Sequence, residues 1–201
     1  MTAKKDDKRE AILQAAAHCF SRFGYDKTTL QDIGDAAKLN KASLYYYFRN
    51  KEDLFVQVVL LEAERYLGAL QEQVQPLMRA TDKIVTYLTG RLEYYQQVLN
   101  LHQLSIENLQ RLEPMFDDVY QAVRGQELAF LGELLSEGVA DREFLKLQPE
   151  RAADALLTVA DGIKHEAVQR ARTRFAHEVD YAPVQEKLTY TLTLLLNGLK
   201  K

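Results

Sequence analysis

Residues 28–55, "TTLQDIGDAAKLNKASLYYYFRNKEDLF", contain the most informative local pattern of the chain. Thr29 followed by Asp32 has the spacing of a capping box, a pattern that begins a helix. The helical pattern breaks at residues 38–40, and Asn40 is a favourable N-cap for a second helix over residues 41–48. Two short helices joined by such a tight turn are typical of a helix-turn-helix.

Helical periodicity extends to both sides of this stretch. Upstream, Ile12, Ala16 and Phe20 recur every four residues before Gly24, so residues 8–48 are predicted to form three short helices. Strand-like alternation is not convincing anywhere, and the prediction is an all-α protein. The later helices are predicted at residues 50–76, 81–99, 101–109, 114–141, 149–174 and 183–200.

The four prolines support these boundaries, because proline is tolerated at the start of a helix and disrupts its interior. Each one stands at a predicted helix end or start: Pro76, Pro114, Pro149 and Pro183. No linker is long or polar enough to separate two independent domains.

Three consecutive tyrosines occupy the second half of the helix predicted over residues 41–48. Successive helical residues are rotated by about 100°, so the three rings cannot all enter one core. With Leu44 and Phe48 on the buried side, Tyr46 falls opposite the core, and Tyr45 and Tyr47 flank it. The alternative is that Tyr45 and Tyr47 pack against neighbouring helices with their hydroxyls at the rim.

The outward face of this helix is small at its other end, where Ala42 and Ser43 stand. Small residues let a helix enter the major groove of DNA, and tyrosine rings can contact thymine methyl groups or phosphate oxygens. Lys51, Thr28 and Thr29 lie near predicted helix starts, where backbone N–H groups favour anions. These three residues are predicted to contact phosphate, against the alternative that Lys51 is a solvated surface lysine.

Charge is distributed unevenly along the chain. Residues 1–55 contain ten Lys and Arg against eight Asp and Glu, whereas the remainder contains sixteen against twenty-one. A weakly basic end on an acidic body fits a protein that reads nucleic acid with one end. The single cysteine, Cys19, excludes an internal disulfide framework and is expected to be buried.

The segment "AILQAAAHCFSRFGYDKTTLQDIGDAAKLNKASLYYYFRNKEDLF" resembles the DNA-binding domain of the TetR family of bacterial transcriptional regulators. The resemblance rests on "CFSRFGYDKTT", "IGDAA" and "LYYYFRNKEDL". It implies a helix-turn-helix DNA-binding domain at residues 1–50 and a helical ligand-binding and dimerisation domain at residues 51–201. It also implies a homodimeric repressor that a small molecule releases from a palindromic operator on double-stranded DNA.

The family's DNA contacts can be transferred position by position. Contacts of the recognition helix fall on Lys41, Ala42, Ser43, Tyr45 and Tyr46, and phosphate contacts fall on Thr28, Thr29, Tyr47 and Lys51. The chain departs from the family at Lys38 and Ala42, where glycine is common, and at Tyr47, where histidine is common. These departures affect which operator is read.

The body offers a dimer interface and a candidate ligand pocket. The helices at 149–174 and 183–200 are expected to pair with a second copy, because the last one has a wide apolar arc; the alternative is burial within its own subunit. Aromatic residues with a few polar tips suit a pocket for a mostly apolar ligand. The candidates are Tyr94, His102, Phe116 and Tyr120.

Catalysis is not indicated. The four histidines have no metal-ligand spacing, and neither a nucleophile elbow nor a glycine-rich phosphate loop occurs. No metal or cofactor is therefore expected, and the chain is expected to be cytoplasmic, since no signal peptide or membrane segment is evident. Two other functions remain open: a DNA-bound protein of nucleoid-occlusion type that acts through a protein partner, and an activator.

Overall fold

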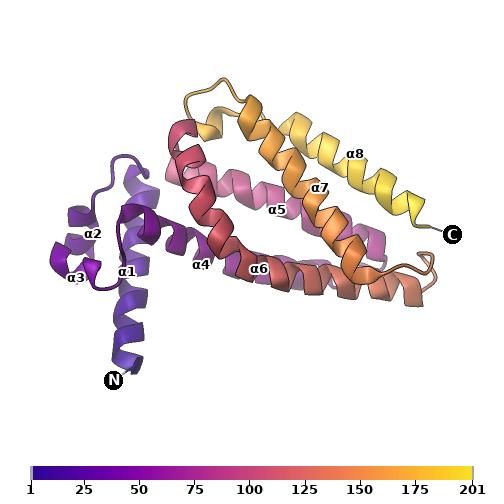
Figure 1. Ribbon diagram of the computed structural model, residues 1–201, viewed down its shortest axis with the longest axis horizontal. Helices are drawn as coiled ribbons and strands as arrows, with labels where there is room; N and C mark the ends of the chain where they lie inside the picture. The colour runs from indigo at the N-terminus through magenta and orange to yellow at the C-terminus, as the bar shows by residue number, and fades with distance from the viewer. Residues whose placement is uncertain (1, 201) are drawn as a thin grey trace. The chain divides into compact units, whose positions relative to one another are not determined.

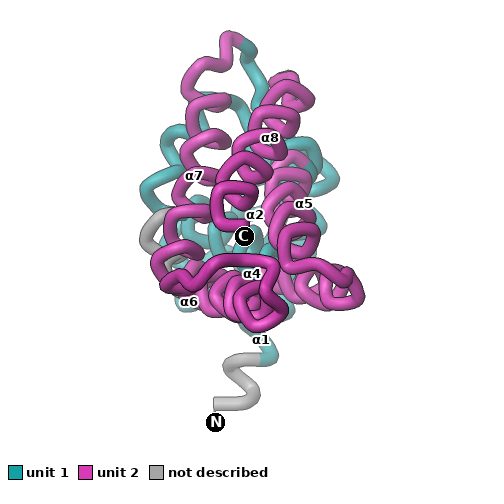
Figure 2. The backbone as a smooth tube through the Cα atoms, turned by 90° about the vertical axis from the view of Figure 1, so that its right-hand side faces the viewer, with its two compact units in different colours: residues 1–63, 97–119, 173–178 teal, residues 64–96, 120–172, 179–201 magenta. Residues whose placement is uncertain are grey.

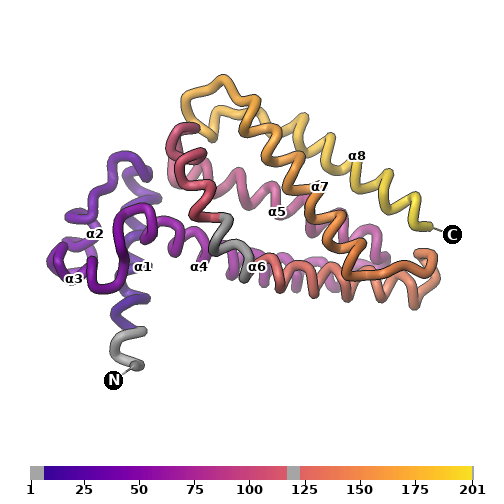
Figure 3. The backbone as a smooth tube through the Cα atoms, viewed as in Figure 1, coloured from indigo at the N-terminus to yellow at the C-terminus, as the bar shows by residue number. Residues whose placement is uncertain are grey.

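The computed structural model is all-α, as the sequence predicted (Figure 1). It describes the backbone of residues 2–200 and the side chains of residues 7–116 and 123–200 (coloured in Figure 3). Within that part the only β-type pairs are two isolated bridges. The helices are α1 Thr2–Phe23, α2 Leu30–Ala36, α3 Lys41–Tyr45, α4 Lys51–Val74, α5 Ala80–His102, α6 Ile106–Ala140, α7 Pro149–Arg170, the 3₁₀ turn η1 Ala176–Glu178, and α8 Ala182–Gly198.

The chain forms two compact units that interleave along the sequence (Figure 2). Unit 1 contains residues 1–63, 97–119 and 173–178, and unit 2 contains residues 64–96, 120–172 and 179–201. Unit 1 thus combines α1, α2 and α3 with the first part of α4, the end of α5 and the start of α6. The division of function at residue 50 stays a prediction.

An aromatic cluster forms the centre of unit 1. The Phe55 ring lies edge-on to Phe20 at 5.0 Å and 4.7 Å from the ring of Tyr25, measured between centroids. Edge-to-face arrangements of this kind are favourable because the positive ring edge meets the negative face. Ile12, Ile33 and other apolar residues complete the core, which buries Leu13, Ala16, Cys19, Leu44, Phe48 and Leu54.

The helix starts of unit 1 follow their local sequence. Thr29 and Asp32 form the predicted capping box at α2, and the Asn40 side chain accepts a hydrogen bond from the Ser43 N–H at α3. Asn50 caps α4 in the same way, with its Oδ1 2.7 Å from the Asp53 nitrogen. These caps satisfy N–H groups that have no partner inside a helix.

Unit 2 is a set of packed helices in which α7 and α8 run side by side and antiparallel (Figures 1 and 2). Its apolar core includes Leu134 and Leu135 of α6, Leu156 and Leu157 of α7, and Leu192 of α8. Apolar positions every three or four residues therefore explain the packing of all three helices.

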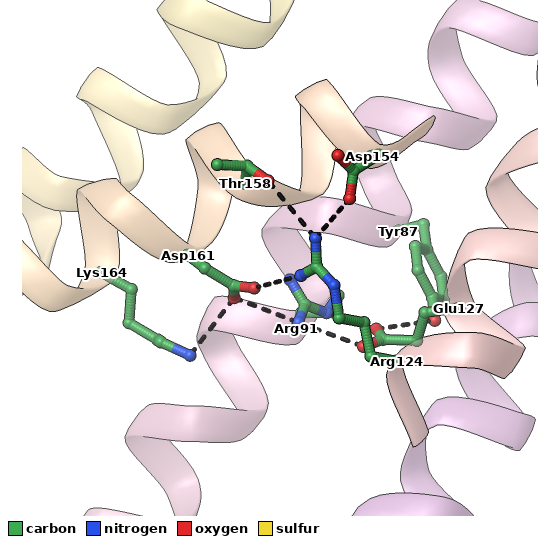
Figure 4. Close-up of polar contacts among 8 residues, drawn as sticks. All are labelled: Tyr87, Arg91, Arg124, Glu127, Asp154, Thr158, Asp161 and Lys164. Atoms are coloured by element: carbon green, nitrogen blue, oxygen red, sulfur yellow. Dashed lines mark hydrogen bonds and ion pairs between the residues drawn. The ribbon is translucent and has the colours of Figure 1, made fainter. Parts of the chain in front are cut away.

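A polar network crosses this apolar interior (Figure 4). The Arg91 Nη2 lies 3.2 Å from a carboxylate oxygen of Glu127 and 3.2 Å from one of Asp161, which joins α5, α6 and α7. Arg124 continues the network to Asp154 at 2.7 Å. Burial raises the pKa of Asp161, but Lys164 and Arg91 outweigh it and hold that pKa below its ordinary value.

Some predicted helix boundaries are wrong. The break expected between residues 109 and 114 is absent, because α6 runs from Ile106 to Ala140 with Pro114 inside it, and residues 101–102 of the helix expected at 101–109 belong to α5. Gln110 and Pro114 are both exposed, so water can satisfy the carbonyl that proline leaves without a donor. The helix expected over residues 41–48 ends at Tyr45, and the N–H groups of Tyr47 and Phe48 share the Leu44 carbonyl in the turn that follows.

Candidate nucleic-acid interface

The turn between α1 and α2 places Thr28 inside the protein. Thr28 is 1% exposed, and its hydroxyl donates to the carbonyls of Gly24 at 2.7 Å and Cys19 at 3.1 Å. Its N–H bonds to the Gly24 carbonyl as well. Thr28 therefore shapes the turn, and its geometry does not favour the phosphate contact predicted from sequence.

Thr29, in contrast, is exposed at the N-terminus of α2. Its hydroxyl donates to Asp32 Oδ2 at 2.7 Å, and the Asp32 N–H returns a bond to that hydroxyl. The hydrogen bonds that the Thr29 hydroxyl and N–H donate to the Asp32 carboxylate lower the pKa of Asp32. Thr29 thus remains available at the surface where a phosphate would meet the start of α2.

Lys51 points inward rather than to solvent. Its ammonium donates to the carbonyls of Tyr25 at 2.9 Å and Thr28 at 3.0 Å, and lies 4.3 Å from the centroid of the Tyr25 ring. Burial lowers the pKa of Lys51, although Glu52 and Asp26 oppose that shift. The sequence predicted a phosphate contact here; the structure gives Lys51 the role of clamping the turn that carries Thr28.

The N-terminal end of α3 presents small side chains at its surface, as the helical repeat predicted. Lys41 and Ala42 are exposed, and Ser43 is half-buried. The Ser43 hydroxyl donates to Asn40 Oδ1 at 2.8 Å, the same atom that accepts the Ser43 N–H. Small side chains at this end of α3 leave its backbone open to close approach.

Tyr46, which the helical repeat places opposite the core, is the most exposed of the three tyrosines. Tyr46 is 69% exposed and Tyr45 is 51% exposed, whereas Tyr47 is half-buried. The rings of Tyr46 and Tyr47 meet edge-on at 5.1 Å between centroids. Leu44 and Phe48 are buried beneath them, so the aromatic face points away from the core of unit 1.

Exposed basic side chains stand next to α2, α3 and α4 along the chain. Lys38 adopts a left-handed backbone conformation, with φ 56°, in the turn between α2 and α3, where the family commonly has glycine. Lys27 and Arg49 are also exposed, one before each of the helix starts at α2 and α4, and neither was predicted as a site residue. The signal that could have found them is their sequence position, next to the predicted phosphate-binding helix ends.

Comparison with known proteins identifies the family. Residues 12–58 match the model for bacterial regulatory proteins of the tetR family. The HTH-type transcriptional repressor KstR2 of Mycolicibacterium smegmatis is 30% identical over 141 residues, which cover 68% of this chain and 67% of KstR2. This chain belongs to the TetR family.

Other TetR-type relatives extend the similarity. The HTH-type transcriptional regulator YhgD of Bacillus subtilis is 25% identical over 155 residues, 75% of this chain and 79% of YhgD. A transcriptional regulator from Cytophaga hutchinsonii shares the fold with a TM-score of 0.78 at 23% identity, covering 96% of this chain and 98% of the other. The TetR-family chain is thus a helix-turn-helix transcriptional regulator, and its named relatives are regulators rather than enzymes.

The ligand-binding candidates of this TetR-family protein belong to both units. Tyr94 belongs to unit 2, where its ring stacks on Tyr66 at 4.6 Å between centroids. His102 and Phe116 belong to unit 1, and both lie against Phe55. The side chain of Tyr120, the fourth candidate, lies outside the described residues.

His102 has a notable environment within unit 1. Its side chain is fully buried, with Nε2 3.2 Å from Glu62 Oε2, while Nδ1 has no hydrogen-bond partner among the described residues. Tyr181 in unit 2 likewise buries its hydroxyl without a described partner. Among the described residues no group of three His, Cys, Asp or Glu side chains could hold a metal ion. No described helix is both long and apolar enough to cross a membrane.

Proposed function

We propose that this TetR-family protein is a homodimeric repressor that binds a palindromic operator through α2 and α3 and leaves it when a small, mostly apolar ligand binds. DNA reading is assigned to residues 1–50, and ligand binding and dimerisation to residues 51–201. The observation that carries the proposal is the exposed aromatic face of α3 beside the helix-turn-helix.

The proposed contacts with bases and groove walls come from α3. Lys41, Ala42, Ser43 and Tyr45 would face the major groove, where small side chains permit close approach and a tyrosine ring can meet a thymine methyl. Tyr46 and Tyr47 would reach the phosphate backbone through their hydroxyls. A soluble protein gains nothing from a tyrosine cluster in water, which supports a partner for this face.

The proposed phosphate contacts fix the register on DNA without reading sequence. Thr29 and the exposed cations Lys27, Lys38 and Arg49 supply them in this proposal. Thr28 and Lys51 would act indirectly, by holding the turn that presents Thr29. This division follows from the inward hydrogen bonds of Thr28 and Lys51 described above.

The proposed dimer forms through α7 and α8. Exposed apolar side chains on α8 support it: Tyr190 is 70% exposed, Leu194 59% and Leu195 40%. Such a patch on a monomer costs free energy in water, and a second copy would cover it. TetR-family regulators act as dimers, and KstR2 is named a repressor, which supports both parts of the proposal.

One experiment tests the DNA-reading proposal. The purified protein is mixed with genomic DNA fragments at fixed salt, and bound fragments are sequenced. The native protein and a Met78→Ala control, altered at a side chain that is 96% exposed in the α4–α5 connection, should enrich one palindromic site. A Tyr45→Ala, Tyr46→Ala double variant should lose that enrichment.

Other outcomes separate the alternatives. Enrichment that survives in the double variant would remove α3's tyrosines from the interface, and a site without two-fold symmetry would contradict the dimer. Release of the operator by the dialysable fraction of a cell extract supports a small-molecule effector. Release by the protein fraction alone would favour the nucleoid-occlusion type of partner.

A further inference from the structure

Tyr25 connects the α1–α2 turn to several other parts of unit 1. It is fully buried, its N–H donates to the His102 carbonyl at 2.8 Å, and its carbonyl accepts from the Lys51 ammonium at 2.9 Å. Its hydroxyl accepts from Arg111 Nη2 at 3.3 Å. Tyr25 therefore ties the turn to the end of α5, the start of α4 and the start of α6.

The start of α6 holds the same turn through two side chains. Arg111 Nη2 lies 3.4 Å from Glu52 Oε1 as well as near the Tyr25 hydroxyl. One helical turn earlier, the Asn108 amide donates to Asp26 Oδ1. Residues three apart on a helix share a face, so Asn108 and Arg111 can bond at the same time to the neighbouring residues Asp26 and Tyr25.

The α1–α2 turn that Asn108 and Arg111 contact leads directly into α2 and α3, the proposed DNA-reading helices. It is short and internally bonded, with the Gly24 N–H on the Phe20 carbonyl and the Thr28 N–H on the Gly24 carbonyl. Thr29 follows at once as the N-cap of α2. Any movement of this turn against α6 would therefore move α2, and with it α3.

The helix that carries Asn108 and Arg111 continues beyond unit 1. α6 is one helix from Ile106 to Ala140; its residues 106–119 belong to unit 1 and its residues 120–140 to unit 2. The Arg111 contacts thus join the reading helices to an element that both units share. Arg111 and Tyr25 therefore lie where they can affect the position of α2 and α3 as well as the packing of unit 1.

Resting on the proposed dimeric operator reader, we propose that Arg111 and Tyr25 are positioning residues that set which separation of operator half-sites the dimer accepts. A two-fold dimer reads half-sites at a spacing fixed by the geometry of its two heads. When the Arg111 contacts are lost, each head gains freedom against α6. The dimer then accepts neighbouring separations more readily, although the residues that touch DNA are unchanged.

A purely structural role would have a different signature. Loss of stability lowers the active fraction and weakens binding to every DNA in proportion. Loss of positioning changes the ratio between the preferred separation and its neighbours at equal active protein. The ratio is therefore the quantity to measure.

The test uses DNA duplexes that carry the selected half-sites at separations changed stepwise by single base pairs. Affinities are measured for the native dimer, Arg111→Ala, Arg111→Lys and Tyr25→Phe, with Arg174→Ala as the matched control. Arg174 is also an exposed arginine of unit 1, but its guanidinium lies over the neighbouring Phe175 ring, and its backbone carbonyl, which accepts from the Ile106 N–H, is kept in the alanine variant. Tyr25→Phe removes only the hydroxyl and keeps the aromatic cluster.

The preference for the native separation should fall about two- to fivefold in Arg111→Ala, the range expected when a partly exposed ion pair is removed. Arg111→Lys and Tyr25→Phe should also lower the affinity ratio between the native separation and its neighbours. Arg174→Ala should leave this ratio unchanged. An unchanged ratio in Arg111→Ala and Tyr25→Phe overturns the positioning role, even if overall binding weakens. A native protein that selects no paired half-sites overturns the proposed function itself, before any variant is compared.

Discussion

At the scale of single residues, the helix-turn-helix depends on a few atoms in close contact. Gly34 lies in α2 where a Cβ would stand 2.8 Å from the Leu39 carbonyl oxygen. The Leu39 N–H bonds to the Gly34 carbonyl at 2.8 Å, which closes the turn over Lys38. The side chain of any other residue at position 34 would push the turn, and α3 after it, away from α2.

Gly34→Ala should therefore lower the free energy of unfolding by about 1–3 kcal/mol, as overpacking of a tight site does. Gly125→Ala is the matched control, because nothing lies within 4 Å of a Cβ at that exposed α6 position. There alanine should raise stability by about 0.5–1 kcal/mol through its better helix propensity. Urea unfolding monitored by circular dichroism measures both changes, and equal effects would show that the Leu39 contact is unimportant.

The helical repeat predicts which single residues are exposed, but not the hydrogen bonds between positions far apart in the chain. Tyr45 and Tyr46 could be placed outside from the helical repeat, because that repeat is a local property. The inward hydrogen bonds of Thr28 and Lys51 could not be predicted in this way. The partners of Lys51 lie 23 and 26 residues away along the chain, and no periodic pattern reports such a contact.

At the scale of elements, helix starts could be predicted and some helix ends could not. The caps at Thr29, Asn40 and Asn50 depend on residues three positions apart, so the sequence contains the whole signal. The end of α3 depends on how the chain turns towards α4. The continuity of α6 through Pro114 depends on an exposed carbonyl. Neither the path of the chain after α3 nor the exposure of that carbonyl can be inferred from the amino-acid sequence.

One cap comes from a distant segment. Glu143, after α6, accepts the N–H groups of Ala80 at 2.9 Å and Thr81 at 3.2 Å at the start of α5. Burial raises the pKa of Glu143, but the hydrogen bonds from Thr81 and Ala80 together with the charge of Arg79 lower it below its ordinary value of 4.5. The ionised carboxylate therefore stabilises the N-terminus of α5.

Glu143→Gln should cost about 1–2 kcal/mol of unfolding free energy at neutral pH, since hydrogen bonds to a charged group are lost. The folded pKa is the lower one, so the contribution is present above pH 4.5 and disappears as the pH falls through the folded value. Denaturant unfolding of both proteins from pH 7 downward measures the difference, and Glu133→Gln, at an exposed α6 position, is the control. A difference that does not change with pH would contradict the cap's dependence on charge.

At the scale of the whole molecule, the two units contribute differently to the proposed function. The surface around α2 and α3 carries exposed cations and tyrosines, whereas the exposed surface of α8 carries apolar side chains. The first kind of surface suits a polyanion and the second suits another protein surface. Proposed DNA binding and proposed dimerisation can therefore be disrupted separately.

Leu194→Glu should weaken dimerisation on the order of tenfold or more, because it would bury a charge in the proposed interface. Sedimentation velocity over a range of protein concentrations measures the monomer fraction. Leu145→Glu adds the same charge at a leucine that is 47% exposed outside α8, and should leave the dimer intact. A Leu194→Glu protein that remains dimeric at low concentration would exclude this face of α8 as the interface.

The exposed tyrosines of α3 have an optical consequence. The chain has eleven tyrosines and no tryptophan, so light absorbed by its phenol rings is not passed to an indole. The buried Tyr87 bonds to the carboxylate of Glu127, an arrangement that quenches phenol fluorescence, whereas Tyr45 and Tyr46 stand in water. Operator DNA covering those two rings would change the emission of the unlabelled protein, which would then report its own occupancy.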